Sequence, residues 1–365
     1  MALQGREHHR QARARLPFAR KVRGVRPGAV SGLGIAAITL VAAMVSAHQR
    51  VVAAEVEARP GQQDNAVVLL SRIQDAARKL DYSGVFTYQQ GEFIESSRVT
   101  HIIDGTGERE RLEVLDGQPR EYLRQNDTVQ CLIPEKNTVL IERRRADRFP
   151  GLLLGPAEGL PQHYDIRTES KLHRVAGREC QIVRIEPRDN SRYGYKLCAD
   201  TSTHLLLKAQ TVDRERGVIE QVAFTSLRLS ADVDPALLKS SWNTQGWKVV
   251  EAAEPPAVDL AKQGWRIPAP PGFTQVMQVA RVMGKRSSVS QLVLSDGLAA
   301  ISVFIEPYDS SMAGDHPRGL MRRGPINVYG TRIADFWVTV LGEVPPATLE
   351  QLAASTEYVP GAPSQ

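Results

Sequence analysis

Apolar and polar residues alternate along most of the chain between residues 85 and 229. This period of two predicts β-strands with one buried face, and turn pairs such as Asp104-Gly105 and Arg216-Gly217 separate the segments. The predicted strands span 84–90, 97–103, 111–115, 120–124, 128–133, 137–142, 163–169, 179–186, 192–199, 203–212 and 217–229. Many short strands at near-regular spacing indicate an antiparallel sheet that curls toward a barrel.

The last of these strands changes phase along its length. Val222 and Phe224 lie on one face, whereas Leu227 and Leu229 lie on the other. We expect a β-bulge or a corner here, because one extra residue moves all later side chains to the opposite face.

A helix precedes this sheet. Apolar residues recur at helical spacing over 64–80, where Asp64 can cap the helix and Lys79 in the last turn suits its dipole. Gly84 then marks the change to extended chain.

A proline-rich stretch divides the chain into two domains. Residues 242–272 contain five prolines and tryptophans without a clear period, and we assign the linker to 242–264. The first domain then covers 55–241, the smaller second domain 265–358, and a tail 359–365.

The second domain is expected to mix strands with one helix. Its predicted strands span 274–282, 289–294, 299–306, 326–330 and 333–342. A short helix begins near Ala347, after two prolines. Residues 307–325 are polar and rich in glycine and proline, which predicts a mobile loop.

The N-terminus has the features of a secretory signal peptide. Residues 1–30 carry eight Lys/Arg and one acid, and an apolar run follows from Ile35 to Ala47. Small residues offer cleavage after Ala47 or Ala54, so the leader is assigned to 1–54. The alternative is a retained membrane anchor, but the run is shorter than the about 20 apolar residues that a spanning helix needs. We therefore expect a protein of the periplasm.

The leader also accounts for the basic charge of the chain. The sequence has 46 basic and 41 acidic residues, of which the leader holds nine and one, leaving 37 and 40 and a formal charge of −3. This balance does not favour a nucleic-acid partner.

Three cysteines are present, Cys131, Cys180 and Cys198. A hairpin that turns near Asp189 places Cys180 opposite Cys198, and the same register puts Val183 opposite Tyr195. One register satisfies both faces, which supports a cross-strand disulfide in an oxidising compartment, although two unpaired thiols remain the alternative. Cys131 is left over and has no fixed histidine partner, so a catalytic role is not expected.

Motifs of catalysis and of metal or cofactor binding are missing from the sequence. After the leader there are five histidines, none in a metal-ligand spacing, and no C-x-x-C, P-loop, G-x-G-x-x-G or G-x-S-x-G. His163 and Asp165 are interpreted as polar neighbours on a strand. We expect neither an enzyme nor a bound cofactor or metal.

One stretch of the first domain could bind lipid. Four arginines at 143–145 and 148 precede Phe149-Pro150-Gly151 and the three leucines Leu152, Leu153 and Leu154. Such a loop could admit acyl chains while the arginines meet anionic head groups. The alternative, compatible with it, is that the leucines plug the open end of the core.

Basic residues of the second domain form a second candidate. These are Lys285, Arg286, Arg318, Arg322, Arg323 and Arg332. They could dock an acidic segment or a lipid phosphate, or they could be an ordinary solvated surface.

In order and spacing, several short segments resemble the MucB/RseB family, closest to its MucB branch. The segments are Ala76–Phe86, Leu115–Glu121, Gly177–Cys180, Arg192–Tyr195, Ser295–Leu298, Met321–Gly324 and Leu341–Pro346. The similarity covers essentially the whole mature chain. The second hairpin cysteine departs from the family pattern, so the disulfide is a hypothesis for this sequence alone.

The resemblance implies an α+β fold. It consists of a large unclosed antiparallel β-barrel, similar to lipoprotein carriers and wrapped around helices, followed by a smaller mixed α/β C-terminal domain of antiparallel strands. It implies a negative regulator of the envelope stress response that binds the periplasmic part of a membrane-anchored anti-sigma factor and shields it from regulated proteolysis. Lipid or lipopolysaccharide fragments loosen that complex, and in the MucB branch alginate biosynthesis is regulated. Self-association into a homo-oligomer is left open.

Residue roles follow as hypotheses. Phe86 and Tyr88 share one face of the first strand and are expected to line a lipid cavity, with Phe149 and the three leucines at its mouth; a core role is the alternative. The partner is placed on the second domain through Arg318, Arg322 and Arg323. Two rival functions are a periplasmic lipid or lipoprotein carrier, which would not need the second domain, and a secreted hydrolase.

Overall fold

A computed structural model describes residues 60–143, 149–150, 157–283, 286–310, 318–323 and 326–360. All of them belong to one compact unit, residues 56–365. The predicted leader and Leu152, Leu153 and Leu154 lie outside the described residues. Within those residues, no helix has the length and apolar character needed to cross a membrane.

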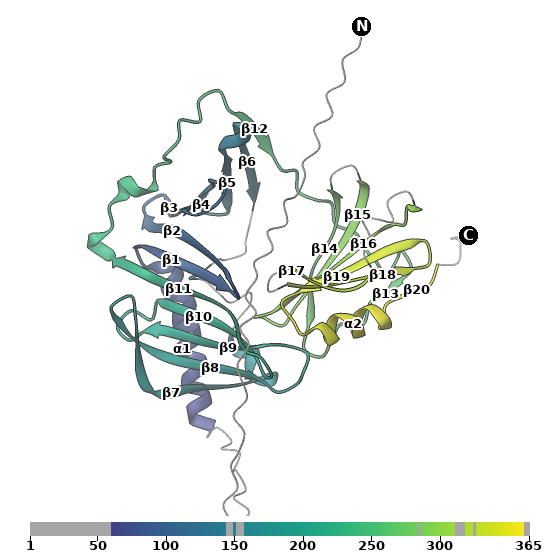
Figure 1. Cartoon of the computed structure of the whole chain (residues 1–365), viewed down its shortest axis with the longest axis horizontal. Coiled ribbons are helices and arrows are strands. Elements are labelled where there is room, and N and C mark those ends of the chain that lie inside the picture. Colours follow the sequence, from purple (N-terminus) through teal and green to yellow (C-terminus); the bar gives the residue numbers. More distant parts are fainter. Residues whose placement is uncertain are drawn as a thin grey trace, which may run out of the picture. The chain divides into compact units, whose positions relative to one another are not determined.

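Twelve strands form the first sheet (Figure 1). They are β1 Tyr82–Gln90, β2 Phe93–Asp104, β3 Gly107–Val114, β4 Glu121–Gln125, β5 Thr128–Ile133, β6 Thr138–Arg143, β7 Tyr164–Val175, β8 Arg178–Pro187, β9 Gly194–Asp200, β10 Leu206–Asp213, β11 Gly217–Leu229 and β12 Lys248–Glu251. Their order is β12-β6-β5-β4-β3-β2-β1-β11-β10-β9-β8-β7. In the described part of the chain the edge strands β12 and β7 do not pair, so the prediction of an open sheet is confirmed, and every strand pair in it except β12–β6 is antiparallel.

Strand β12 is an element of the predicted linker that the sequence did not indicate. It lies within 242–264 and pairs with β6 in parallel, Val249 opposite Val139. Four residues are too few to give a period, so the pattern could not identify this strand. The connection to the second domain therefore forms one edge of the first sheet.

The phase change in the last predicted strand is a bulge, as expected. Opposite β1, Val85 pairs with Ser226 and Phe86 with Phe224, so Thr225 is the extra residue. Its hydroxyl donates to Val85 O at 3.0 Å. Glycine is required at position 84, next to this bulge, because a Cβ there would lie 2.4 Å from Ser226 O.

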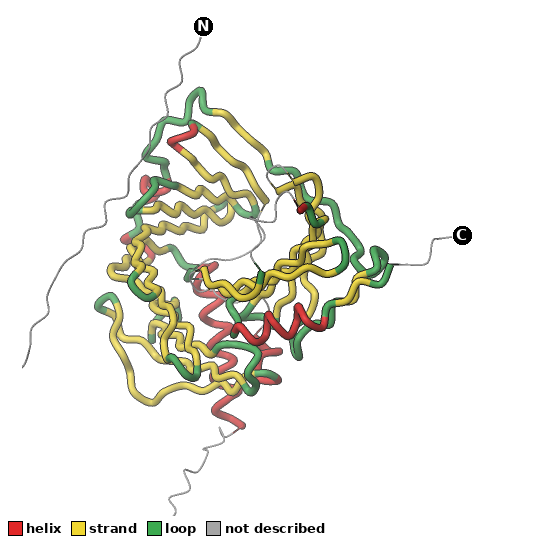
Figure 2. The backbone as a smooth tube through the Cα atoms, turned by 45° about the vertical axis from the view of Figure 1, so that its right-hand side comes forward, coloured by secondary structure: helices red, strands yellow, loops and turns green. Residues whose placement is uncertain are grey.

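Helix α1, Pro60–Lys79, packs across one face of this sheet (Figure 2). Its buried residues Ala66, Leu70 and Ile73 join a core with alternate side chains of β7 to β10. It begins four residues before the predicted start. Four short 3-10 helices complete this part: η1 Pro134–Lys136, η2 Ala157–Gln162, η3 Ser230–Asp232 and η4 Pro235–Leu238.

The second sheet has six antiparallel strands in the order β14-β15-β16-β19-β18-β17. They are β14 Thr274–Met283, β15 Arg286–Ser295, β16 Ala300–Pro307, β17 Gly319–Arg323, β18 Ile326–Ile333 and β19 Phe336–Gly342. Helix α2, Pro346–Ser355, buries Leu349 and Leu352 against it. A two-stranded pair, β13 Trp265–Arg266 and β20 Glu357–Tyr358, completes this part.

Part of the predicted mobile loop 307–325 is a strand. β17 pairs with β18 along its whole length, Met321 opposite Val328. Three of its five residues are Gly319, Arg322 and Arg323, so the composition favoured a loop. Residues 311–317 lie outside the described residues.

Candidate functional site

Three aromatic rings meet on the inner face of the first sheet. The ring centroids of Phe86 and Phe149 are 5.2 Å apart, those of Phe149 and Phe224 5.0 Å, and those of Phe86 and Phe224 6.1 Å. Phe86 and Phe224 are buried, and Phe149 contacts two clusters of the core. The structure thus brings two predicted lipid-binding residues together as parts of the core, the role that the sequence left as the alternative.

Tyr88 lies two residues further along β1 and faces a carboxylate. Its hydroxyl donates to Glu220 Oε2 at 2.8 Å, while Glu220 Oε1 accepts from Thr211 Oγ1 at 2.7 Å. Burial and the bond to Glu220 raise the pKa of Tyr88. The phenol therefore stays neutral and gives this end of the apolar surface one polar position.

The predicted partner-binding arginines lie along the edge of the second sheet. Arg318 and Arg332 border a hollow of about 480 Å³, whose other lining residues include Tyr329. Arg332 also stacks over Tyr308, with its Cζ 4.3 Å from the ring centroid. Arg322 is exposed on β17, and its Nε donates to Asn327 Oδ1 at 3.3 Å. The Arg323 side chain lies outside the described residues.

Cys180 and Cys198 form a disulfide in the structure. The predicted register of this hairpin was wrong by two residues: Cys180 lies opposite Asp200, and Cys198 lies opposite Ile182. The two cysteines are therefore diagonal neighbours. Both are buried, whereas the prediction placed them on a polar face.

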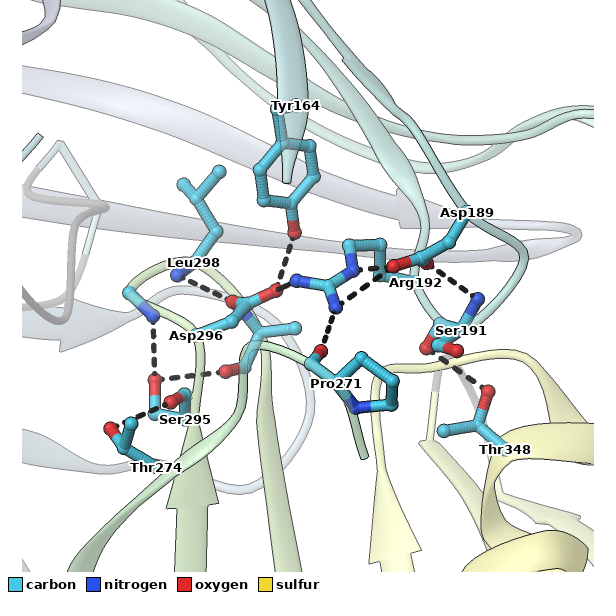
Figure 3. A network of polar contacts seen from close by, with 12 residues as sticks. Tyr164, Asp189, Ser191, Arg192, Pro271, Thr274, Ser295, Asp296, Leu298 and Thr348 are labelled. Atoms are coloured by element: carbon cyan, nitrogen blue, oxygen red, sulfur yellow. Dashed lines mark hydrogen bonds and ion pairs between the residues drawn. The ribbon is translucent and has the colours of Figure 1, made fainter. Parts of the chain in front are cut away.

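A buried polar network joins the two sheets (Figure 3), and the sequence did not predict it. Arg192, in the loop between β8 and β9, donates from Nη1 to Asp296 Oδ2 at 2.6 Å. Neither side chain is exposed. The Tyr164 hydroxyl donates to the same Asp296 oxygen at 2.8 Å.

The remaining donors of Arg192 are also satisfied. Nε donates to Asp189 Oδ1 at 3.1 Å, and Nη2 donates to the carbonyl oxygen of Pro271. The guanidinium stacks on Phe273, with its Cζ 4.9 Å from the ring centroid. Because a buried charge is tolerated only when it is paired and hydrogen-bonded, this arrangement fixes the contact.

The sequence contains a signal for this network. Arg192–Tyr195 and Ser295–Leu298 are two of the segments that carry the family resemblance, and they lie on its two sides. Two more contacts continue it, from Asn327 Nδ2 to Tyr193 Oη at 3.1 Å and from Thr348 Oγ1 to Ser191 O at 3.0 Å.

In the part of the chain that the structure describes, no group of three or more His, Cys, Asp or Glu could hold a metal ion. His163 and Asp165 do not form an ion pair there; Asp165 lies 3.6 Å from Arg167. The described residues thus provide a cluster of aromatic rings at one sheet, basic side chains at the edge of the other, and a hydrogen-bonded junction between the two.

Both domains match family models, described as the MucB/RseB N-terminal domain at residues 65–242 and the MucB/RseB C-terminal domain at residues 259–357. The sigma factor AlgU regulatory protein MucB of Pseudomonas aeruginosa is 32% identical over 298 residues, which are 78% of this chain and 89% of the relative. The sigma-E factor regulatory protein RseB of Haemophilus influenzae is 25% identical over 301 residues, 79% of this chain and 90% of the relative.

Solved structures agree with these matches. A crystal structure of MucB in complex with MucA(peri) aligns with a TM-score of 0.63 and 28% identity over 81% of this chain and 99% of that chain. A crystal structure of MucB aligns with a TM-score of 0.56 and 29% identity over 81% of this chain and 98% of that chain.

Proposed function

Since this chain belongs to the MucB/RseB family, we propose that it is a periplasmic regulator of an envelope-stress sigma factor. It binds the periplasmic segment of a membrane-anchored anti-sigma factor, shields that segment from regulated proteolysis and releases it in response to lipid. The observation that carries the proposal is the similarity to a sigma factor regulator over both domains, together with a related MucB solved in complex with MucA(peri).

The edge of the second sheet suits an extended, acidic partner. β17 is the last strand of its sheet, so in the described part of the chain its outer backbone groups have no strand partner. An extended peptide can add to such an edge through main-chain hydrogen bonds. Arg318 and Arg322 are exposed along it, which supplies the charge complementarity for acidic side chains.

A binding assay and a protease-protection assay together test the proposed function and this surface. The protein is immobilised, and retention of the anti-sigma segment from the same organism is measured together with its cleavage by protease, with and without lipid. We expect retention, slower cleavage, and loss of both on adding lipid. Replacing both Arg318 and Arg322 by Glu should weaken retention about tenfold, because exposed charges at an interface control the rate of association with a charged partner.

The control for charge reversal is Arg266→Glu, an exposed arginine of the same domain on β13. It should leave retention unchanged. Full retention by the Arg318→Glu/Arg322→Glu variant contradicts the docking surface. No retention by the unmodified protein, with lipid transfer intact, favours the rival function of a lipid or lipoprotein carrier.

The lipid response is assigned to the inner face of the first sheet. The rings of Phe86, Phe149 and Phe224 pack against one another there, so an acyl chain must displace one of them to lie between them. Phe149 is the best candidate, because it lies in a turn and not in a strand of the sheet. Each methylene that an acyl chain buries there contributes about 0.8 kcal/mol.

Truncating Phe149 to Ala should open this space. We expect a fluorescent fatty-acid probe to bind more tightly, while the free energy of unfolding falls because a cavity is left, by less than the about 3–5 kcal/mol of a fully buried ring since Phe149 is only partly buried. Val276→Ala, which truncates an apolar side chain that is 59% exposed on β14 of the second sheet, is the control and should change neither quantity. Weaker binding of the probe by the Phe149 variant would show that the ring is not a plug.

A further inference from the structure

A hollow of about 270 Å³ lies on the first sheet, over strands β7 to β10. It is lined by Glu169, His173, Arg174, Val175, Ile182, Arg184, Lys196, Cys198, Lys208 and Gln210. On β8 and β9 these positions alternate with Val183, Ile185 and Leu197, which pack in the core with α1. The hollow therefore opens on the face opposite these side chains, and its apolar lining residues Ile182 and Cys198 belong to the hydrophobic cluster that also contains Phe86, Phe149 and Phe224.

An irregularity in β7 creates this space. Pairing with β8 shifts between Thr168 and Leu172, so the residues between them leave the ladder. The Gln181 side chain fills the gap by donating to Glu169 O. The floor is apolar, formed in part by Ile182 and Cys198, and the disulfide to Cys180 fixes β8 to β9 there.

The charges around the hollow are not balanced. Glu169 is the only carboxylate of the lining, and it is already shared: it accepts from Arg184 Nε and lies 3.3 Å from His173 Nε2. Among the described residues, Lys196 and Lys208 have no carboxylate within ion-pair distance, although both are half-buried.

The two lysines are also close to one another. Lys196 lies opposite Gln210 and Lys208 opposite Cys198, which makes the lysines diagonal neighbours across β9 and β10. Diagonal neighbours on one face lie about 7–8 Å apart, within reach of long side chains. Two like charges at this spacing, with Arg174 at the rim, repel each other unless an anion lies between them.

We propose that this hollow binds a phosphate monoester. Phosphate carries about −1.5 to −2 charges at pH 7, which matches two or three unbalanced cations better than a single carboxylate does. Lysine ammoniums serve as point-charge donors to phosphate oxygens, and the apolar floor accommodates a small carbon group next to the phosphate. The site does not depend on the proposed regulatory function.

Titration calorimetry with the purified protein tests the site. The probes are inorganic phosphate, glycerol 3-phosphate and a short-chain phosphatidic acid below its micelle concentration. We expect saturable binding of all three, weakened about tenfold by Lys196→Gln and about tenfold by Lys208→Gln. The control is Lys171→Gln, an exposed lysine of β7 outside the lining, which should bind as the unmodified protein does.

The probes also distinguish two sources of the phosphate. Tighter binding of phosphatidic acid than of glycerol 3-phosphate, with the same dependence on the lysines, assigns the site to a lipid head group; equal binding assigns it to a soluble phosphate. A rise of the thermal midpoint with phosphate, lost in Lys196→Gln, supports binding independently and reports on folding. No saturable binding, or the same loss in Lys171→Gln, overturns the proposal.

Discussion

Among single residues, buried charged side chains depend most on their hydrogen-bond partners. Glu121 on β4 is fully buried, and its Oε1 accepts from Arg111 Nη2 at 2.6 Å and from Ser241 Oγ at 2.6 Å. Burial alone would raise the pKa of Glu121, but the bonds from Arg111 and Ser241 outweigh it and lower the pKa. One carboxylate thus ties two strands to the start of the interdomain segment.

Glu121→Gln should therefore destabilise the protein in a pH-dependent way. Because the folded-state pKa lies below the ordinary value, the unfolded chain takes up the proton first, and the stabilisation present at neutral pH is lost as the pH falls below about 4.3. We expect the variant to lose about 2 kcal/mol at pH 7, as breaking a buried pair costs up to about 3–5 kcal/mol, and the difference to shrink in acid.

Urea denaturation at several pH values measures this difference. Glu350→Gln, an exposed residue of α2, serves as the control and should match the unmodified protein throughout. A stability difference for Glu121→Gln that stays constant down to pH 3 would mean that the carboxylate charge is not the cause.

Two aromatic residues show what the alternation of polar and apolar positions can predict and what it cannot. The place of Phe86 on an inward face of β1 follows from period two, and the structure buries it. The sequence placed Phe149 at the same predicted cavity as Phe86, but the contact of its ring with Phe224 could not be predicted, because its segment has no period and long-range packing decides where the ring lies.

Among elements, the existence of strands was predictable and their register was not. All eleven strands predicted between residues 84 and 229 are present, with ends that differ by up to six residues. The β8–β9 hairpin was placed two residues out of register, because a shift by two keeps every side chain on its face. In its loop, Arg192 binds Asp189 and also Asp296 of the second domain, and the alternation of polar and apolar residues contains no signal for these contacts.

The disulfide of this hairpin should stabilise the folded state by restricting the unfolded chain. It closes a loop of sequence separation 18, for which the chain-entropy relation gives about 3 kcal/mol. Replacing Cys180 and Cys198 by Ser should cost about that amount in urea denaturation. Cys131→Ser is the control, with a loss below about 1 kcal/mol expected; an equal loss in both would indicate that packing, not the cross-link, matters.

At the scale of the whole molecule, the two sheets are connected by contacts between turns distant in sequence. Arg192 and Asp296 are 104 residues apart, and each lies in a loop with no period. The sequence predicted two domains and a proline-rich connection between them, but not which loops would meet, because charge pairing across such a distance has no local pattern.

A double-mutant cycle on this pair tests the junction. Removing either charge, by Arg192→Met or Asp296→Asn, should cost about 3–5 kcal/mol, because the other charge remains buried and unpaired. The double variant should lose less than the sum, with a coupling above about 1 kcal/mol. The exposed pair Lys262–Asp259 gives the reference cycle, with a coupling below about 1 kcal/mol; strict additivity at Arg192 and Asp296 would contradict the buried pairing.

The parallel strand β12 has a consequence for how this protein can be divided. A fragment that stops at residue 242 keeps every antiparallel strand of the first sheet but loses β12. The backbone groups of Thr138–Arg143 on that side then have no partner strand. Unpaired edge strands readily form hydrogen bonds with strands of other molecules. Such a truncated fragment should therefore assemble with itself at high concentration, whereas one extended past Glu251 should stay monodisperse.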